Sequence, residues 1–175
     1  GNILPSVTEA VWAPNGSAVI IEQNNYKSSY LNLKTGEVRP LNQNISGIDW
    51  SKNSQKIGYL YYEQRNGEGQ ISLANPDGSV FKNILPTRAD KLKIDWISDN
   101  KISFYSPEGE DHSLFVFNLE NQQLEKVLGS LSGLKVSWSP DGSKLIYSYL
   151  EAGEPKLSLL DLDAKTHLAI DLPAK

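Results

Sequence analysis

The 175-residue sequence contains no cysteine and no methionine. Without cysteine, the chain has no disulfide, no thiolate ligand for zinc and no thiol nucleophile. Every apolar run is shorter than the roughly 18 residues that a membrane-spanning helix needs, so we expect no membrane insertion. The chain begins with Gly1 in place of methionine, which indicates a processed or excised segment.

An excess of basic residues is also missing. The 17 Lys and Arg are outnumbered by 21 Asp and Glu, which gives a formal net charge of −4. Nucleic-acid binding favours a basic patch or stripe, so we expect no nucleic-acid partner. The hydrophobic content of 39% and charged content of 22% are typical of a globular domain.

The motifs of common enzyme classes are absent as well. There is no Gly-x-Ser-x-Gly nucleophile motif, since the similar segment 129–133 has leucine at its centre, and no phosphate-binding loop. His112 follows Glu110 and Asp111 in an expected hairpin loop, which we interpret as a solvated turn because one loop supplies too few converging metal ligands. His167 opens an expected outer strand. We predict a protein that is not an enzyme, with no catalytic residue, cofactor or metal.

A repeat marked by tryptophan is the strongest positive signal. The spacings between successive tryptophans are 38, 46 and 42 residues, close to the blade length of WD-type propellers. Another 37 residues follow the last one, so four units fill the chain. The tryptophans are Trp12, Trp50, Trp96 and Trp138.

Turn residues follow the tryptophans. Segments 13–17 and 139–143 read Ala-Pro-Asn-Gly-Ser and Ser-Pro-Asp-Gly-Ser, while 51–55 and 97–100 are degenerate versions. Proline fixes φ for a turn, and Asn or Asp followed by Gly supplies positive φ, so these segments predict hairpins. The repeat residues in these turns are Pro14, Gly16, Pro140, Asp141 and Gly142.

Each unit continues with three further apolar runs that are rich in β-branched and aromatic residues. Four short antiparallel strands in about 42 residues form one propeller blade, so we predict an all-β chain of about sixteen strands in one propeller domain. The predicted blades span 7–41, 45–85, 91–128 and 134–172, and segment 129–133 is expected as the loop between the last two blades. Segment 1–6 resembles 83–86 and would be the remnant of a preceding outer strand or a closure segment.

Segments 136–147 and 11–20 resemble the repeat of TolB-like, WD-like β-propellers. The resemblance covers all four units and implies the propeller fold. It also implies a bacterial protein in an extracytoplasmic or periplasmic location.

Two arrangements of the four blades remain open: a closed four-blade ring, or half of a larger propeller. An open arc would expose an apolar sheet face at each end, and exposed apolar patches of that size bind partners. We therefore predict that two copies associate through their terminal blades and complete eight blades.

Three groups of side chains are candidate functional residues. Asp49 and Asp95 precede a tryptophan on the expected inner strands, where they could bind a cation or basic peptide, or pin neighbouring blades by accepting backbone hydrogen bonds. We favour the second role for them, and packing between blades for the tryptophans. Tyrosine is favoured in binding hot spots, which makes four tyrosines candidate interface residues. These are Tyr26, Tyr30, Tyr61 and Tyr62.

The predicted function is a non-catalytic scaffold for protein–protein interaction or assembly, because loops on a rigid body carry recognition. Two alternatives remain. The chain could be the gating propeller of a prolyl-oligopeptidase-like hydrolase, or a propeller that binds glycans or ions.

Overall fold

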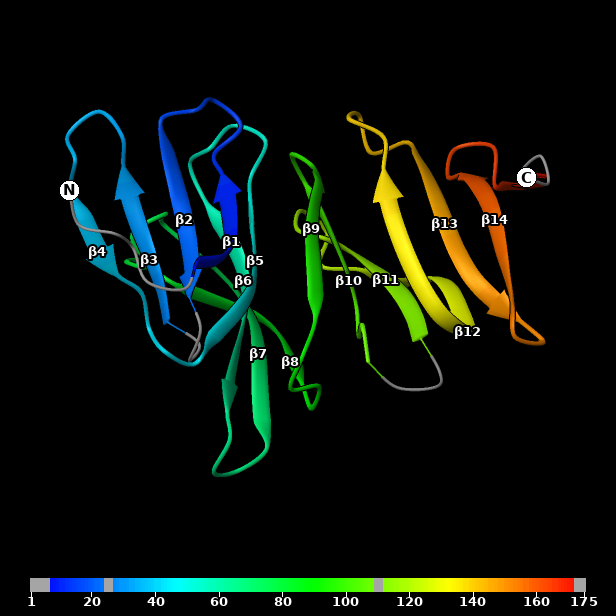
Figure 1. Ribbon diagram of the computed structural model, residues 1–175, viewed down its shortest axis with the longest axis horizontal. Coiled ribbons are helices and arrows are strands. Elements are labelled where there is room, and N and C mark those ends of the chain that lie inside the picture. Colours follow the sequence, from blue (N-terminus) through cyan, green and yellow to red (C-terminus); the bar gives the residue numbers. More distant parts are fainter. Residues whose placement is uncertain (1–6, 24–26, 109–111, 172–175) are drawn as a thin grey trace. The chain divides into compact units, whose positions relative to one another are not determined.

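The computed structural model describes residues 7–23, 27–108 and 112–171. The chain divides into two compact units, 1–99 and 100–175, which are described separately. All the regular structure in the described residues is β-strand, and neighbouring strands run antiparallel (Figure 1). The all-β prediction is confirmed. No helix in these residues has the length and apolarity of a membrane span.

The first sheet of unit 1 holds four strands that pair in chain order. Its register pairs Trp12 with Val19, Val19 with Leu31, and Leu31 with Val38, so one apolar residue from each strand lies on the same face. We call this row, Trp12, Val19, Leu31 and Val38, the Trp12 ladder. The opposite face carries the Ile20 ladder, which consists of Val11, Ile20, Tyr30 and Arg39. The strands are β1 (Val7–Trp12), β2 (Ala18–Gln23), β3 (Lys27–Asn32) and β4 (Val38–Pro40).

The second sheet repeats this plan. Its tryptophan, Trp50, pairs with Ile57, which pairs with Ala74, so these three residues correspond to the first three of the Trp12 ladder. The strands are β5 (Ile45–Trp50), β6 (Ile57–Glu63), β7 (Glu68–Ala74) and β8 (Lys82–Thr87). Unit 1 also contains β9 (Lys93–Ser98), the first strand of the third repeat.

The core of unit 1 lies between its first two sheets. Ile20 is fully buried and belongs to the same apolar cluster as Trp50 and Ile57. The Ile20 ladder of the first sheet therefore packs against the Trp50 face of the second. This stacking of one sheet on the next is how propeller blades bury both faces.

Unit 2 contains six strands that pair in chain order. Its core forms where β13 and β14 pack on β10 to β12, through Leu114, Leu128, Leu145 and Leu160. The strands are β10 (Lys101–Tyr105), β11 (His112–Asn118), β12 (Leu124–Trp138), β13 (Lys144–Glu151), β14 (Glu154–Asp161) and β15 (Thr166–Ala169).

The long strand β12 differs from the sequence prediction. Segment 129–133, expected as a loop, lies within the strand, so fifteen strands are described where about sixteen were predicted. Its first half pairs with β11 and its second half pairs with β13. Positive φ at Ser130 (54°) and Gly133 (63°) turns the backbone between the two pairings without breaking the strand.

Candidate functional site

The tryptophans of the second and third repeats lie in the interior, with exposed fractions of 3% for Trp50 and 5% for Trp96. The Nε1–H of Trp50 donates a hydrogen bond of 2.9 Å to the backbone carbonyl of Val11 in the first sheet. Its ring also lies 6.5 Å from that of Tyr30, between centroids. This tryptophan therefore holds two successive repeats together by an apolar contact and a polar one.

Trp12 occupies the same place in the first repeat but is 59% exposed. The expectation that every tryptophan packs between blades is wrong for this residue, because no described sheet covers the Trp12 ladder. Val38, at the other end of the ladder, is 62% exposed. Trp138 is half-buried and packs against the apolar core of unit 2.

The last sheet also has an uncovered apolar face. The register of β12 to β15 aligns Ser137, Ile146, Leu159 and Leu168, which we call the Ile146 ladder. Within it, Ile146 is 44% and Leu168 is 61% exposed. The residues that alternate with these, Leu145 and Leu160, are buried in the core of unit 2.

The two aspartates of the inner strands differ in their bonding. Asp49 Oδ2 accepts a hydrogen bond of 2.6 Å from the backbone N–H of Trp96, which links β5 to β9. Oδ2 of Asp95 is buried with no hydrogen-bond partner among the described residues. Both were predicted to pin neighbouring blades by accepting backbone hydrogen bonds. Asp49 makes such a bond, and Oδ2 of Asp95 accepts none from the described residues.

Burial raises the pKa of both carboxyl groups. For Asp49 the backbone N–H groups of Trp96 and Trp50 oppose this effect. Burial raises the pKa of Asp95 to about 6, although the positive charge of Lys93 acts in the opposite direction. No backbone N–H group of the described residues donates to Asp95 to offset the effect of burial. Burial also raises the pKa of Glu22, a residue that sequence reasoning missed. Its only signal was a carboxylate directly after the apolar run 18–21.

The predicted turn residues form local hydrogen-bonded turns. Asn15 Oδ1 accepts from Ser17 N (2.9 Å), and Gly16 adopts a φ of 69°. In the last repeat, Asp141 accepts from the hydroxyl of Ser139 (2.6 Å) and from Ser143 N (3.1 Å). These bonds lower the pKa of Asp141 to about 2, and the bond from the Ser139 hydroxyl has the largest effect. Pro14, Pro140 and Gly142 lie in the same two turns, which serve structure.

Two of the candidate interface tyrosines, Tyr30 and Tyr61, pack against the apolar core of unit 1. Tyr30 is half-buried in the Ile20 ladder, and its hydroxyl accepts a hydrogen bond of 3.3 Å from Asn32 Nδ2. The Tyr61 hydroxyl accepts one of 3.4 Å from Asn44 Nδ2. Tyr62 is half-exposed beside the turn that ends β6. Tyr26 lies outside the described residues.

His112 was predicted to lie in a solvated turn, and this prediction is wrong. His112 begins β11, is 3% exposed, and its Nδ1 lies 2.5 Å from the carbonyl oxygen of Ser106, so the ring is part of the interior. Glu110 and Asp111, its expected neighbours in a solvated loop, lie outside the described residues. His167 is exposed, and its Nδ1 lies 3.1 Å from the hydroxyl of Tyr147. In the described part of the chain, no three His, Asp or Glu are grouped to hold a metal ion.

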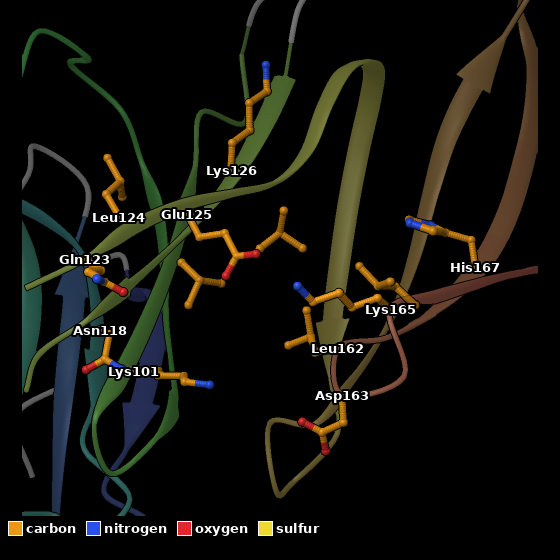
Figure 2. A pocket seen from close by; sticks show the side chains of 13 residues that line it. Lys101, Asn118, Gln123, Leu124, Glu125, Lys126, Leu162, Asp163, Lys165 and His167 are labelled. Atoms are coloured by element: carbon orange, nitrogen blue, oxygen red, sulfur yellow. The ribbon is translucent and has the colours of Figure 1, made fainter. Parts of the chain in front are cut away.

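A cleft of about 790 Å³ opens in unit 2 (Figure 2). One side is lined by residues of β10, β11 and the first half of β12, and the other by residues of β14, β15 and the turn between them. Sequence reasoning did not find the cleft, because its walls come from strands that are distant in the chain. Three cationic side chains and two anionic ones line it, together with His167 and amides. The charged residues are Lys101, Lys126, Lys165, Glu125 and Asp163.

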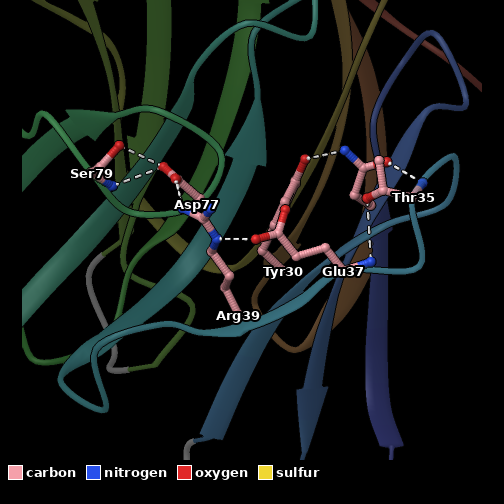
Figure 3. A network of polar contacts seen from close by, with 7 residues as sticks. Tyr30, Thr35, Glu37, Arg39, Asp77 and Ser79 are labelled. Carbon is pink, nitrogen blue, oxygen red and sulfur yellow. Dashed lines mark hydrogen bonds and ion pairs between the residues drawn. The ribbon is translucent and has the colours of Figure 1, made fainter.

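A polar network links the outer edges of the first two sheets (Figure 3). Arg39 donates from Nε to Glu37 (2.7 Å) and from Nη1 to Asp77 (2.6 Å), which lies in the turn after β7. Asp77 also accepts from the backbone N–H and hydroxyl of Ser79. Ion pairs this exposed contribute little stability, so the network adds little to the packing of the two sheets.

No protein-family model matches the sequence, and no curated protein matches it. Solved structures do. TolB from Acinetobacter baumannii aligns with a TM-score of 0.75 at 13% identity, over 94% of this chain and 43% of that one. An oligogalacturonate lyase in complex with manganese aligns with a TM-score of 0.72 at 13% identity, over 94% and 53%.

The β-propeller domain of the Trilobed protease from Pyrococcus furiosus aligns with a TM-score of 0.70 at 14% identity, over 97% of this chain and 57% of that domain. The chain thus spans about half the length of the structures it matches. At such low identity these likenesses establish the fold alone. The chain has the fold of TolB-like β-propeller domains, and it aligns with part of each of these larger structures.

Proposed function

We propose that the chain is a non-catalytic module of four propeller blades that assembles with protein through the faces of its first and last sheets. One observation carries this proposal. Both ladders that face outward have exposed apolar side chains at their two ends or centre, whereas Ile20, Trp50 and Ile57, at the interface between the first two sheets, are buried. The exposed side chains are Trp12 and Val38 in one ladder and Ile146 and Leu168 in the other. Large exposed apolar faces mark interaction sites. A sheet face of this kind is suited to another β-sheet, which can match its strand spacing.

A comparison of binding by matched variants tests the proposal. The chain is immobilised and exposed to an extract of the cells in which the protein is made. Trp12→Arg combined with Leu168→Glu places a charge on each ladder, and we expect it to lose the proteins that the wild type retains. Phe81→Ser is the control, because Phe81 is 67% exposed but lies in neither ladder. Equal retention by all three chains would contradict the proposal.

A second candidate function, the binding of an acidic sugar, is favoured by the cleft of unit 2. Its three lysines give it one more positive than negative side chain, and a lysine can bind the carboxylate of a uronic acid. The name of one structural neighbour is that of an oligogalacturonate lyase. A rise in unfolding temperature with galacturonate oligomers, absent with neutral glucose oligomers and reduced by Lys165→Ala, would support this candidate. No shift with either sugar would rule against it.

A further inference from the structure

We propose that the partner of the two uncovered faces is a second copy of this chain, with the Trp12 ladder of one copy packed on the Ile146 ladder of the other. The inference rests on the proposed function, since it names the occupant of the same faces. The interface between the first two sheets of unit 1 supplies the template for the contact.

In that template, Trp50 lies on Ile20 and donates its Nε1–H to the carbonyl of Val11. The exposed fractions are 3% for Trp50 and 0% for Ile20. One side of this interface is thus a tryptophan-centred face, and the other is a face built on Val11, Ile20, Tyr30 and Arg39.

Both sides of the template recur uncovered on this chain. Trp12 stands at the position of Trp50, directly before the turn that joins the first two strands of its repeat. Ile146 stands at the position of Ile20, eight residues after its tryptophan in each case. Their exposed fractions are 59% and 44%. Each copy therefore presents one half of the contact at each of these two faces.

The registers specify which residues would meet. Ser137 pairs with Ile146 as Val11 pairs with Ile20, so the carbonyl of Ser137 is the acceptor for Nε1–H of Trp12 from the other copy. Leu159 takes the place of Tyr30, whose ring lies beside Trp50 in the template. The indole of Trp12 would then be covered by two aliphatic side chains.

The outer edge of the contact differs from the template on both sides. Leu168 occupies the register position of Arg39, which pairs with Asp77 in the template. On the tryptophan side, Leu31 aligns with Ala74, so Lys34 stands at the position of Asp77. The ion pair of the template is therefore replaced by a leucine and a lysine, and the apolar side chains at the centre of the two faces carry the contact.

The two faces differ, so the contact is head-to-tail and each copy offers it twice. A ring closed by two copies would have eight blades, within the usual range of four to eight. Three copies would give twelve, which lies outside that range. The expected assembly is a closed dimer.

Mass measurement by light scattering across a broad concentration range tests the inference. We expect twice the 19.4 kDa of one chain. Trp12→Arg and Ile146→Arg should each give a monomer, and Phe81→Ser should remain a dimer. Circular dichroism confirms folding, and Leu168→Glu serves in place of any variant that fails to fold. A wild-type chain that is monomeric throughout would overturn the inference, as would an assembly larger than two copies.

Mixing the two arginine variants tests the direction of the contact. Each keeps one intact face, so an equimolar mixture should form a one-to-one complex, more weakly than the wild type because one contact replaces two. A dimer that survives Ile146→Arg would show a symmetric contact through Trp12 alone and would refute the head-to-tail arrangement. If the chain is a monomer that still retains other proteins through its ladders, the second copy is excluded while the proposed function stands.

Discussion

The carboxylate of Asp49 accepts a hydrogen bond of 2.6 Å from the backbone N–H of Trp96, 47 positions further along the chain. Asp49 precedes the tryptophan of one repeat, and its acceptor oxygen binds the tryptophan backbone of the next. The bond thus fixes the innermost strands of successive repeats to each other. It also satisfies a backbone donor that would otherwise be buried without a partner.

We expect Asp49→Ala to lower the free energy of unfolding by about 1–3 kcal/mol, since it leaves the N–H of Trp96 without its acceptor. Asp49→Asn should cost less, because its amide oxygen can still accept the bond. Denaturant unfolding of both variants measures the difference. Asp99→Ala, at an exposed position of the same unit, is the control and should change little. Equal losses for Ala and Asn would show that the bond contributes nothing.

Asp95 should make stability depend on pH. Its pKa is about 6 in the folded chain against 3.8 when unfolded, so the folded state binds the proton more tightly. The stability that this gives is complete below pH 3.8 and is lost as the pH rises through 6. Asn does not ionise, so Asp95→Asn does not lose this stability as the pH rises. Between about pH 4 and pH 7, the unfolding free energy of the variant should therefore increase by about 1–3 kcal/mol relative to that of the wild type.

Unfolding midpoints of the two chains across this pH range measure the effect. Asp77→Asn is a control of opposite sign, because hydrogen bonds from Ser79 lower the pKa of Asp77 and its stabilising contribution is present above pH 3.8. A constant difference between wild type and Asp95→Asn at all pH values would contradict the prediction.

Trp50 and Trp96 form a matched pair for the indole hydrogen bond. Both rings are buried, but Nε1 of Trp50 bonds to Val11 while Nε1 of Trp96 has no partner among the described residues. Trp50→Phe should therefore cost about 1 kcal/mol more in unfolding free energy than Trp96→Phe, since both lose similar volume and only one loses a bond. Thermal or denaturant unfolding measures the difference. A larger loss from Trp96→Phe would be inconsistent with this bonding.

Two glycines should respond in opposite ways to alanine. Gly47 lies where the register of β5 shifts, has a φ of 59°, and a Cβ there would overlap the carbonyl oxygen of Leu92. Gly47→Ala should lower stability by at least about 2 kcal/mol. A Cβ at Gly58 would lie 3.5 Å from the ring of Trp96, an ordinary contact, so Gly58→Ala should be neutral or stabilise by up to about 1 kcal/mol. Chemical denaturation of both variants checks the contrast.

The local structure was largely predictable because it depends on short stretches of sequence. The turns at 13–17 and 139–143 form from their own Asn, Asp and Gly, and the apolar runs between turns became strands. Segment 129–133 was predicted as the loop between the third and fourth blades. It is strand because partners on both sides, β11 and β13, supply hydrogen bonds that outweigh the weak local preference of the sequence.

The sequence by itself determined the repeats, their turns and their strands, since backbone preference and the alternation of side chains act over a few residues. Tertiary structure alone decided which of these equivalent residues are buried. Trp12 and Trp50 stand in the same local setting, yet one is 59% exposed and the other 3%. Burial depends on whether a neighbouring sheet covers the face, and contacts between distant segments supply that sheet. The same reason explains why the buried His112 and the cleft of unit 2 could not be found from the chain alone.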